Sequence, residues 1–134
     1  RVGGTKKKHI QTRVISATNK DLNKMIDDGL FRKDLYFRLG VIKVQVPSLS
    51  ERPDDIVPLA KYFLQQFSNK FGKKFSEISS EAENALRAHE WTGNVRELKN
   101  LVERIVVLKD SGPVVPRDLP ARIRRARTSR TTIR

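Results

Sequence analysis

The sequence contains no cysteine, so neither a disulfide framework nor a thiolate metal site is available to it. It also contains no apolar run near the roughly 20 residues that span a bilayer, and no signal peptide pattern. With 37% hydrophobic and 32% charged residues, the composition is typical of a globular protein rather than a disordered one. We therefore expect a soluble, cytoplasmic protein with no membrane partner.

Several kinds of active site are also missing. The two histidines, His9 and His89, have no neighbours at metal-ligand spacing, so neither a metal site nor a Ser/His/Asp hydrolase is predicted. No G-x-x-x-x-G-K-[ST] phosphate loop occurs, and no apolar run ends in Asp-Glu. Taken alone, the sequence holds no complete active site.

Positive charge is abundant but unevenly placed. The formal net charge is +13, and residues 1–13 and 121–134 carry 11 of the 28 basic residues. Residues 14–120 carry 17 basic and all 15 acidic residues, so they are nearly neutral. A basic helical nucleic-acid-binding module and a stand-alone interaction domain are therefore alternatives to be weighed.

The first third of the chain predicts two strands and two helices. Residues 13–18 and 41–46 are apolar and rich in β-branched side chains, as in buried strands. Asn19 follows the first of them, where a parallel sheet opens onto a ligand crevice. Residues 21–28 predict a short helix or a turn, with a plain surface connection as the alternative, and residues 31–39 predict a helix; each segment is ended by glycine. On a continuous helix, Arg32 and Arg38 would diverge by roughly 120°. The two side chains would then not naturally bind one ligand held within the same chain.

The remainder predicts three helices and a tail. Their apolar positions recur at helical spacing over about 54–71, 80–89 and 94–110. Pro58 is tolerable in a first turn, which places the first helix start at Asp54 or Asp55. Ser80 with Glu83 predicts a capping box for the second helix. From Ala121 the composition predicts a tail. Two strands do not form a stable parallel sheet alone, which indicates a part of something larger.

The stretch Trp91–Asn100 predicts the entrance of the third helix. Gly93 interrupts the preceding chain, Asn94 is a good N-cap, and the Glu97 carboxylate can reach back to the cap amide. Arg96 opposes the helix dipole there, at a cost of roughly 0.3–1 kcal/mol. It either awaits an anion at the helix N-terminus or is solvated or paired with Glu97 or Glu103.

Four fragments, in order and at matching spacing, carry a resemblance to a known family. They are RVISATNKDL (13–22), FRKDLYFRL (31–39), VPSLSERPDDI (46–56) and WTGNVRELKNLVER (91–104). Over roughly residues 13–120 the chain resembles the sigma-54-dependent transcription activators, which are bacterial enhancer-binding AAA+ ATPases.

The resemblance implies a mixed α/β, mostly helical fold, the C-terminal portion of an AAA+ P-loop module. Residues 1–48 would be the end of the α/β subdomain, 49–120 a three-helix lid, and 121–134 a basic linker or tail. The phosphate loop, the acidic Mg²⁺-binding strand end and the sigma-54-contacting loop would precede Arg1. A helix-turn-helix DNA-binding domain would follow Arg134. The chain alone would then be inactive.

The resemblance also implies roles for three residues of the first third. Asn19 matches the first sensor, which detects the γ-phosphate of ATP. Arg32 and Arg38 match the pair of arginines associated with a finger that acts on the neighbouring subunit's nucleotide and stabilises charge in phosphoryl transfer.

Four further positions match the family's nucleotide pocket. Arg96 corresponds to the second sensor, a lid arginine that contacts nucleotide in its own subunit. Ile56 lies where the family packs against adenine, although an isoleucine on a helix face is more often core, and Asn94 and Val95 would line the same pocket. Thr92 departs from the family, which nearly always has proline there.

The implied cofactors are ATP and Mg²⁺ in the intact protein, with none bound tightly by this chain alone. The implied partners are sigma-54 RNA polymerase holoenzyme, identical subunits in a hexameric or heptameric ring, and DNA. Ser50, which stands in place of an arginine common in the family, removes no catalytic group.

Overall fold

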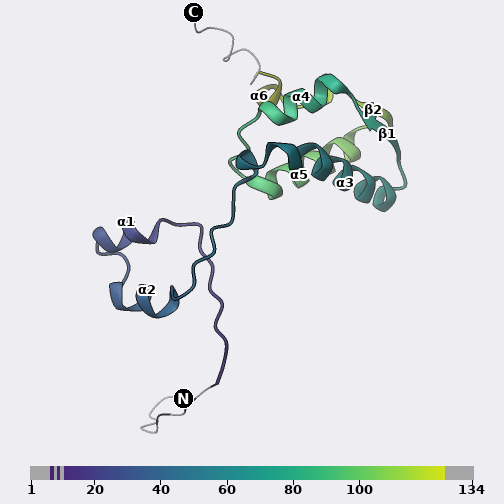
Figure 1. Cartoon of the computed structure of the whole chain (residues 1–134). Coiled ribbons are helices and arrows are strands. Elements are labelled where there is room, and N and C mark those ends of the chain that lie inside the picture. The colour runs from purple at the N-terminus through teal and green to yellow at the C-terminus, as the bar shows by residue number, and fades with distance from the viewer. Residues whose placement is uncertain (1–6, 8, 10, 126–134) are drawn as a thin grey trace, which may run out of the picture. The chain divides into compact units, whose positions relative to one another are not determined.

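The computed structural model describes residues 7, 9 and 11–125 (Figure 1). The chain divides between Gln45 and Val46 into two compact units. We call them the N-terminal unit and the C-terminal unit, and each is described by itself.

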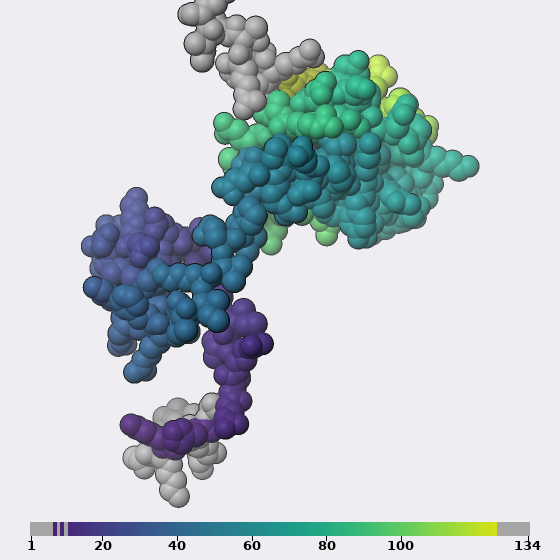
Figure 2. Space-filling model, in the orientation of Figure 1, coloured from purple at the N-terminus to yellow at the C-terminus, as the bar shows by residue number. Residues whose placement is uncertain are grey.

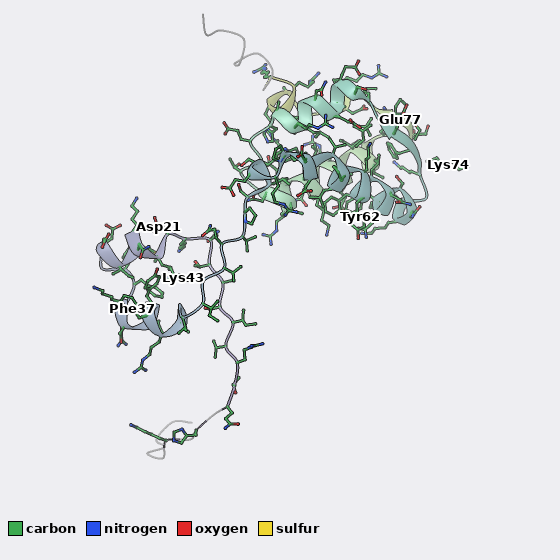
Figure 3. All side chains as sticks on the ribbon, viewed as in Figure 1. Asp21, Phe37, Lys43, Tyr62, Lys74 and Glu77 are labelled. Carbon is green, nitrogen blue, oxygen red and sulfur yellow. The ribbon has the colours of Figure 1, made fainter. Side chains whose placement is uncertain are left out.

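The N-terminal unit contains two short helices, α1 (Leu22–Asp27) and α2 (Lys33–Leu39). The Asp21 carboxylate accepts a hydrogen bond from an amide in the first turn of α1 at 3.1 Å. Lys43, after α2, places its ammonium 4.1 Å from the centre of the Tyr36 ring and donates to the Tyr36 hydroxyl (Figure 3). Helix α2 confirms the helix predicted at 31–39, and α1 shows that 21–28 forms a helix, one of the two possibilities left open for it.

The two strands predicted at 13–18 and 41–46 are not formed. Both segments are extended chain without strand pairing. Their apolar side chains are 70 to 87% exposed: Val14, Ile15, Val41, Ile42, Val44 and Val46. A strand exists through hydrogen bonds to a neighbour, and neither segment pairs with one within the described chain. The strand prediction is therefore wrong for this structure, although the extended backbone is as expected.

The C-terminal unit contains most of the regular structure (Figure 1) and is the larger of the two units in the space-filling view (Figure 2). Its elements are η1 (Leu49–Glu51), α3 (Pro53–Phe71), β1 (Lys74–Ile78), α4 (Ser80–Ala88), α5 (Asn94–Leu108), β2 (Ser111–Val114), η2 (Pro116–Asp118) and α6 (Ala121–Arg124). Helix α3 packs against both α4 and α5, and α6 packs against α4. None of the helices in the described chain is both long and apolar enough to cross a membrane.

The apolar stripes of α3 and α5 meet in one core. The α5 residues Leu98, Leu101 and Ile105 are buried, as their helical spacing predicts. The stripe is exposed at its two ends, because Val95 is 38% and Leu108 is 72% exposed. The predicted helical faces therefore describe the core well and fail only where the helices extend beyond it.

The helix starts differ from the predicted ones by one or two residues. Helix α3 begins at Pro53, so Pro58 lies in its second turn. The carbonyl left without an amide partner there is that of Asp54, whose residue is exposed and can be hydrated. Ser79, not Ser80, caps α4, since its hydroxyl accepts a hydrogen bond from the Ala82 amide at 3.2 Å.

Strands β1 and β2 form a parallel pair that the sequence did not predict. Lys74 lies opposite Ser111, and Ile78 lies opposite Val114, with an irregularity between. Ile78 and Val114 are 6% and 3% exposed, so each strand buries an apolar side chain, and Phe75 of β1 packs partly buried against the same core. Two parallel strands suffice here because the core, not the pairing alone, stabilises them.

The predicted tail begins later than Ala121. Residues 121–124 form α6, and its Ile123 side chain is 0% exposed. One buried isoleucine is enough to hold this turn of helix against α4. The remainder of the predicted tail, residues 126–134, lies outside the described residues.

The turn between α4 and α5 is organised around Trp91. This side chain is 1% exposed, and its indole N–H donates to the Leu86 carbonyl at 2.7 Å. Its backbone has φ of +51°, a region that bulky residues rarely adopt. The His89 ring meets the indole edge-on, with ring centres 4.7 Å apart. Burial and the hydrogen bond therefore compensate for a strained backbone.

The Glu97 carboxylate closes the same turn. One oxygen lies 2.9 Å from His89 Nε2, and the other accepts a hydrogen bond from the Gly93 amide at 3.0 Å. A Cβ on Gly93 would lie 2.7 Å from the Glu97 Cβ, so this close approach requires glycine. Burial alone would raise the pKa of Glu97, but the hydrogen bonds from His89 and Gly93 and the charges of His89 and Arg122 outweigh it and lower that pKa.

Asn94 does not cap α5 as predicted. Gly93 is the cap residue, and Glu97 reaches back to its amide. Asn94 is the first helical residue and has φ of +53°, which asparagine tolerates better than most residues. Its side-chain oxygen accepts a hydrogen bond from the Leu49 amide at 2.9 Å. The Asn94 side chain therefore links α5 to η1 instead of capping the free amides at the start of its own helix.

We expect Trp91→Phe to destabilise the C-terminal unit by roughly 2–4 kcal/mol, because it leaves the Leu86 carbonyl unpaired and opens space in the core. Urea unfolding monitored by circular dichroism measures the change. Tyr62→Phe is the matched control: Tyr62 lies on α3 and is 54% exposed (Figure 3). This control should change stability by about 0.5 kcal/mol or less. Equal effects of the two substitutions would contradict the role given to Trp91.

We expect Glu97 to contribute to acid unfolding. Because its pKa is lower in the folded state than the ordinary 4.5, its stabilising contribution is complete above that value. The contribution is lost as the pH falls through the folded-state pKa. Glu97→Gln should therefore flatten the fall in stability below about pH 4.5, measured by urea unfolding at several pH values. Glu77→Gln, an exposed substitution on β1 with the same charge change, is the control; an unchanged acid slope in Glu97→Gln would count against the prediction.

Candidate functional site

The predicted site residues fall into both units. Asn19, Arg32 and Arg38 belong to the N-terminal unit, and the other four belong to the C-terminal unit. The geometry of each set is therefore described within its own unit.

The two arginines of the N-terminal unit are in different situations. Arg32 is the N-cap residue of α2, and its guanidinium forms two hydrogen bonds with Asp34, at 3.0 and 2.5 Å. Arg38 is exposed in the last turn of α2, where a cation complements the helix dipole. In the part of the chain that the structure describes, Arg38 forms no ion pair. Asn19 is exposed in the bend before α1.

Arg32 and Arg38 do not lie on one continuous helix, as was predicted, because α2 begins at Lys33 and Arg32 has an extended backbone. The predicted divergence of about 120° therefore does not apply to them. Arg32 is less available to an external ligand than Arg38 because its guanidinium is paired with Asp34.

In the C-terminal unit, a groove of about 350 Å³ runs along α5 and is bounded by the start of α6. Its lining residues are Gly93, Arg96, Glu97, Asn100, Leu101, Arg104, Pro120 and Arg122. The α5 members recur every three or four residues, so they share one helix face. The groove thus presents three guanidinium groups and one carboxylate.

Arg96 is exposed in the first turn of α5 and lines this groove. Its two predicted acidic partners are Glu97 and Glu103. Among the described residues, Arg96 has no ion pair with either of them, and Glu97 is engaged by His89, Gly93 and Arg122. A cation that opposes the helix dipole without a carboxylate partner is available to an external anion.

The other predicted pocket residues are less accessible. Ile56 is 1% exposed and belongs to the hydrophobic core. Val95 is 38% exposed, and the Asn94 side chain is occupied by the Leu49 amide. Of the four residues matched to a nucleotide pocket, only Arg96 lines the groove.

Sequence reasoning missed two cations of the groove. Arg104 lies eight residues after Arg96, and this spacing could have revealed it on the same helix face. Arg122 could not be found in this way, because it comes from α6, whose position depends on the burial of Ile123. The site is therefore more basic than the motif alone indicated.

The residues present fit the phosphate part of a nucleotide. Guanidinium groups bind phosphate through paired hydrogen bonds, and the groove holds three of them. For a divalent cation the fit is absent, since the described residues contain no cluster of three His, Cys, Asp or Glu side chains able to hold a metal. The described residues can thus contribute cations to an anion site, and they contain no cluster of side chains that would hold a metal by itself.

Comparison with protein families matches both parts of the chain. Residues 50–134 match the family described as AAA+ ATPase lid domain. Residues 1–45 match the sigma-54 interaction domain.

Individual relatives agree with these matches. The nitrogen fixation protein AnfA of Azotobacter vinelandii is 43% identical over 131 residues, which are 98% of this chain and 25% of AnfA. The regulatory protein AtoC of Escherichia coli strain K12 is 44% identical over 125 residues, 92% of this chain and 27% of AtoC. The crystal structure of NtrX from Brucella abortus in complex with ADP matches with a TM-score of 0.80 and 42% identity, over 92% of this chain and 29% of that chain.

The chain spans about a quarter of the length of the curated relatives it matches. The predicted fold class, mixed α/β and mostly helical with an AAA+ lid, is confirmed. The lid match covers more than half of the chain and is preceded by the sigma-54 interaction match. The chain therefore belongs to the AAA+ ATPases with a sigma-54 interaction domain, the family of the sigma-54-dependent transcription activators.

Proposed function

We propose that these residues work as the C-terminal part of an ATPase module, with residues 49–120 as its lid. The whole protein would use ATP hydrolysis in the cytoplasm to remodel sigma-54 RNA polymerase and activate transcription. The family matches support this function. The observation that carries it is Arg96, exposed at the start of α5 in a groove with two further arginines and without a described acidic partner.

In this proposal Arg96 contacts a phosphate of the nucleotide bound to its own subunit. ATP, when bound, supplies the phosphoryl group that is transferred, and Mg²⁺ would be held by residues outside this chain. NtrX, one structural relative, was crystallised with ADP and with ATP. Because α5 packs on α3, a phosphate contact at Arg96 would orient the helices of the C-terminal unit toward the nucleotide.

We assign Arg38 the role of a finger that acts on the neighbouring subunit's nucleotide in a homo-oligomeric ring. Arg38 is exposed, whereas Arg32 is held by both oxygens of Asp34 and would first have to leave that ion pair. Arg32 is accordingly assigned a supporting role. Asn19, exposed at the end of an extended segment, is proposed as the γ-phosphate sensor.

The alternative of a basic nucleic-acid-binding module has weaker support. The excess charge lies in residues 1–13 and 121–134, and the chain between them is nearly neutral. The family matches favour the ATPase. DNA binding is therefore assigned to a helix-turn-helix domain outside this chain.

Arg38→Ala in the ATPase module that contains these residues should lower the rate of ATP hydrolysis by a factor of about 10³ or more and leave nucleotide binding intact. Phosphate release and binding of a fluorescent nucleotide measure the two properties. Lys33→Ala, which removes an exposed cation at the other end of α2, is the control and should retain activity.

A mixing experiment tests whether Arg38 acts between subunits. Arg38→Ala subunits are combined with subunits inactivated in the phosphate loop. If the finger acts on a neighbour, some interfaces pair an intact loop with an intact Arg38, and part of the activity returns. No recovery in demonstrably mixed rings would refute action across the interface.

Arg96→Ala should weaken the coupling between nucleotide state and lid position and reduce nucleotide affinity by about tenfold, because a charge-assisted hydrogen bond is lost. A pair of distance labels, one in each unit, reports lid movement between the ADP-bound and nucleotide-free states. Lys99→Ala removes an exposed cation of α5 outside the groove and is the control. Lid movement equal to that of the wild type would exclude this role for Arg96.

A further inference from the structure

We propose that Arg122 on α6 is a second phosphate-binding cation of the groove, which exchanges its contact with Glu97 for a phosphate bound beside Arg96. This inference rests on the proposed function only in assuming that Arg96 receives a phosphate. It assigns a binding role to α6, where the sequence predicted a tail.

Arg122 and Arg96 line the same groove from two different helices. The Arg122 guanidinium lies 3.7 Å from the Glu97 carboxylate, which is beyond normal hydrogen-bond length, and the side chain is 57% exposed. The Glu97 side chain is 18% exposed, but an ion pair at this separation with one exposed partner contributes little to stability. The present partner of Arg122 is therefore easily exchanged.

Glu97 does not need Arg122 to remain satisfied. One of its oxygens lies 2.9 Å from His89 Nε2, and the other accepts a hydrogen bond from the Gly93 amide at 3.0 Å. These two contacts stay in place if the Arg122 guanidinium turns away. A phosphate, in contrast, can accept two parallel hydrogen bonds from one guanidinium and carries more charge than the carboxylate.

The backbone of α6 is held while the Arg122 side chain stays free to move. Ile123 is 0% exposed in the core, and α6 packs on α4. Arg122 thus extends from an anchored turn to the edge of the groove, which lowers the entropic cost of using it as a ligand. Arg124, on the same short helix, is exposed but does not line the groove.

The chemistry that fits is a pyrophosphate-like anion. The cations are spread along the groove, since Arg96 and Arg104 are separated by a rise of about 12 Å on α5, and Arg122 lines the groove from α6. Two adjacent phosphates would contact Arg96 and Arg122 together, while a single small anion would contact one of them. The Glu97 carboxylate also lines the groove but is held by its two donors.

Titration of the 134-residue chain with millimolar inorganic pyrophosphate tests this, with arginine Nε–Hε and backbone amide signals followed by NMR at physiological salt. The signals of Arg96 and Arg122 and the Gly93 amide should shift together. Arg122→Ala should weaken binding by about five- to tenfold, as expected for one lost charge-assisted contact. Arg124→Ala, with the same change of net charge on the same helix, should leave affinity within about twofold, since charge away from the groove is screened.

Glu97→Gln separates competition from a structural role. If Glu97 competes with phosphate for Arg122, Glu97→Gln should tighten pyrophosphate binding severalfold, and this gain should vanish in the Arg122→Ala background. If Glu97 merely held the turn, the substitution would weaken binding in both backgrounds, which would overturn the exchange. Circular dichroism of each variant confirms that the fold is retained.

Further outcomes distinguish this inference from the proposed function. If Arg96→Ala weakens binding and Arg122→Ala acts like Arg124→Ala, the inference fails and the phosphate role of Arg96 stands. If neither arginine signal responds, both fail. ADP binding that is tighter than pyrophosphate binding and still dependent on Arg122 identifies a nucleotide as the source of the phosphates, and equal affinity identifies free polyphosphate. Arg122 dependence seen only with a DNA duplex overturns the inference.

Discussion

The arrangement of the C-terminal unit depends on how the chain reverses between α4 and α5. Two side chains, Trp91 and Glu97, fix the geometry of that turn. Trp91 is buried, and its indole N–H donates to the Leu86 carbonyl. The Glu97 carboxylate is hydrogen-bonded to the Gly93 amide and to the His89 ring. Trp91 has a strained backbone conformation, and the burial of its large side chain in the core compensates for that strain. Glu97 requires glycine at the point of closest approach. Together they place Arg96 at the first turn of α5, facing the groove instead of the core.

The groove combines two sources of charge with different physical origins. Arg96 and Arg104 share one broad face of α5, since two successive steps of four residues leave them about 80° apart around the helix axis. Arg122 is added only because one isoleucine, Ile123, buries itself and fixes α6 beside the groove. Glu97 contributes to both the turn and the groove. The residue that positions the start of α5 is therefore also a neighbour of Arg122, at 3.7 Å, while its two contacts within the turn do not involve the groove cations.

In the N-terminal unit, two segments have the sequence pattern of strands but lack the packing that strands need. Residues 13–18 and 41–46 have the composition of buried strands, yet their apolar side chains are largely exposed. A strand is stabilised by neighbours on both sides and by cover on its faces, and neither is present among the described residues. In the C-terminal unit, β1 and β2 have a weaker strand pattern but form, because α3 and the core supply that cover for Ile78 and Val114.

The sequence by itself determined the longer helices α3, α4 and α5, the family and the position of Arg96 in the first turn of α5. Helical periodicity, glycine stops and four ordered motifs are local properties, and Leu98, Leu101 and Ile105 are buried as their spacing requires. Only the tertiary structure decided which groups meet across long separations. The Asn94 side chain bonds to η1 rather than to its own helix, β1 pairs with β2 across two helices, and Arg122 reaches the groove from α6. The physical reason is that a residue's type and spacing specify its own backbone, whereas its partner depends on how buried side chains bring distant segments together.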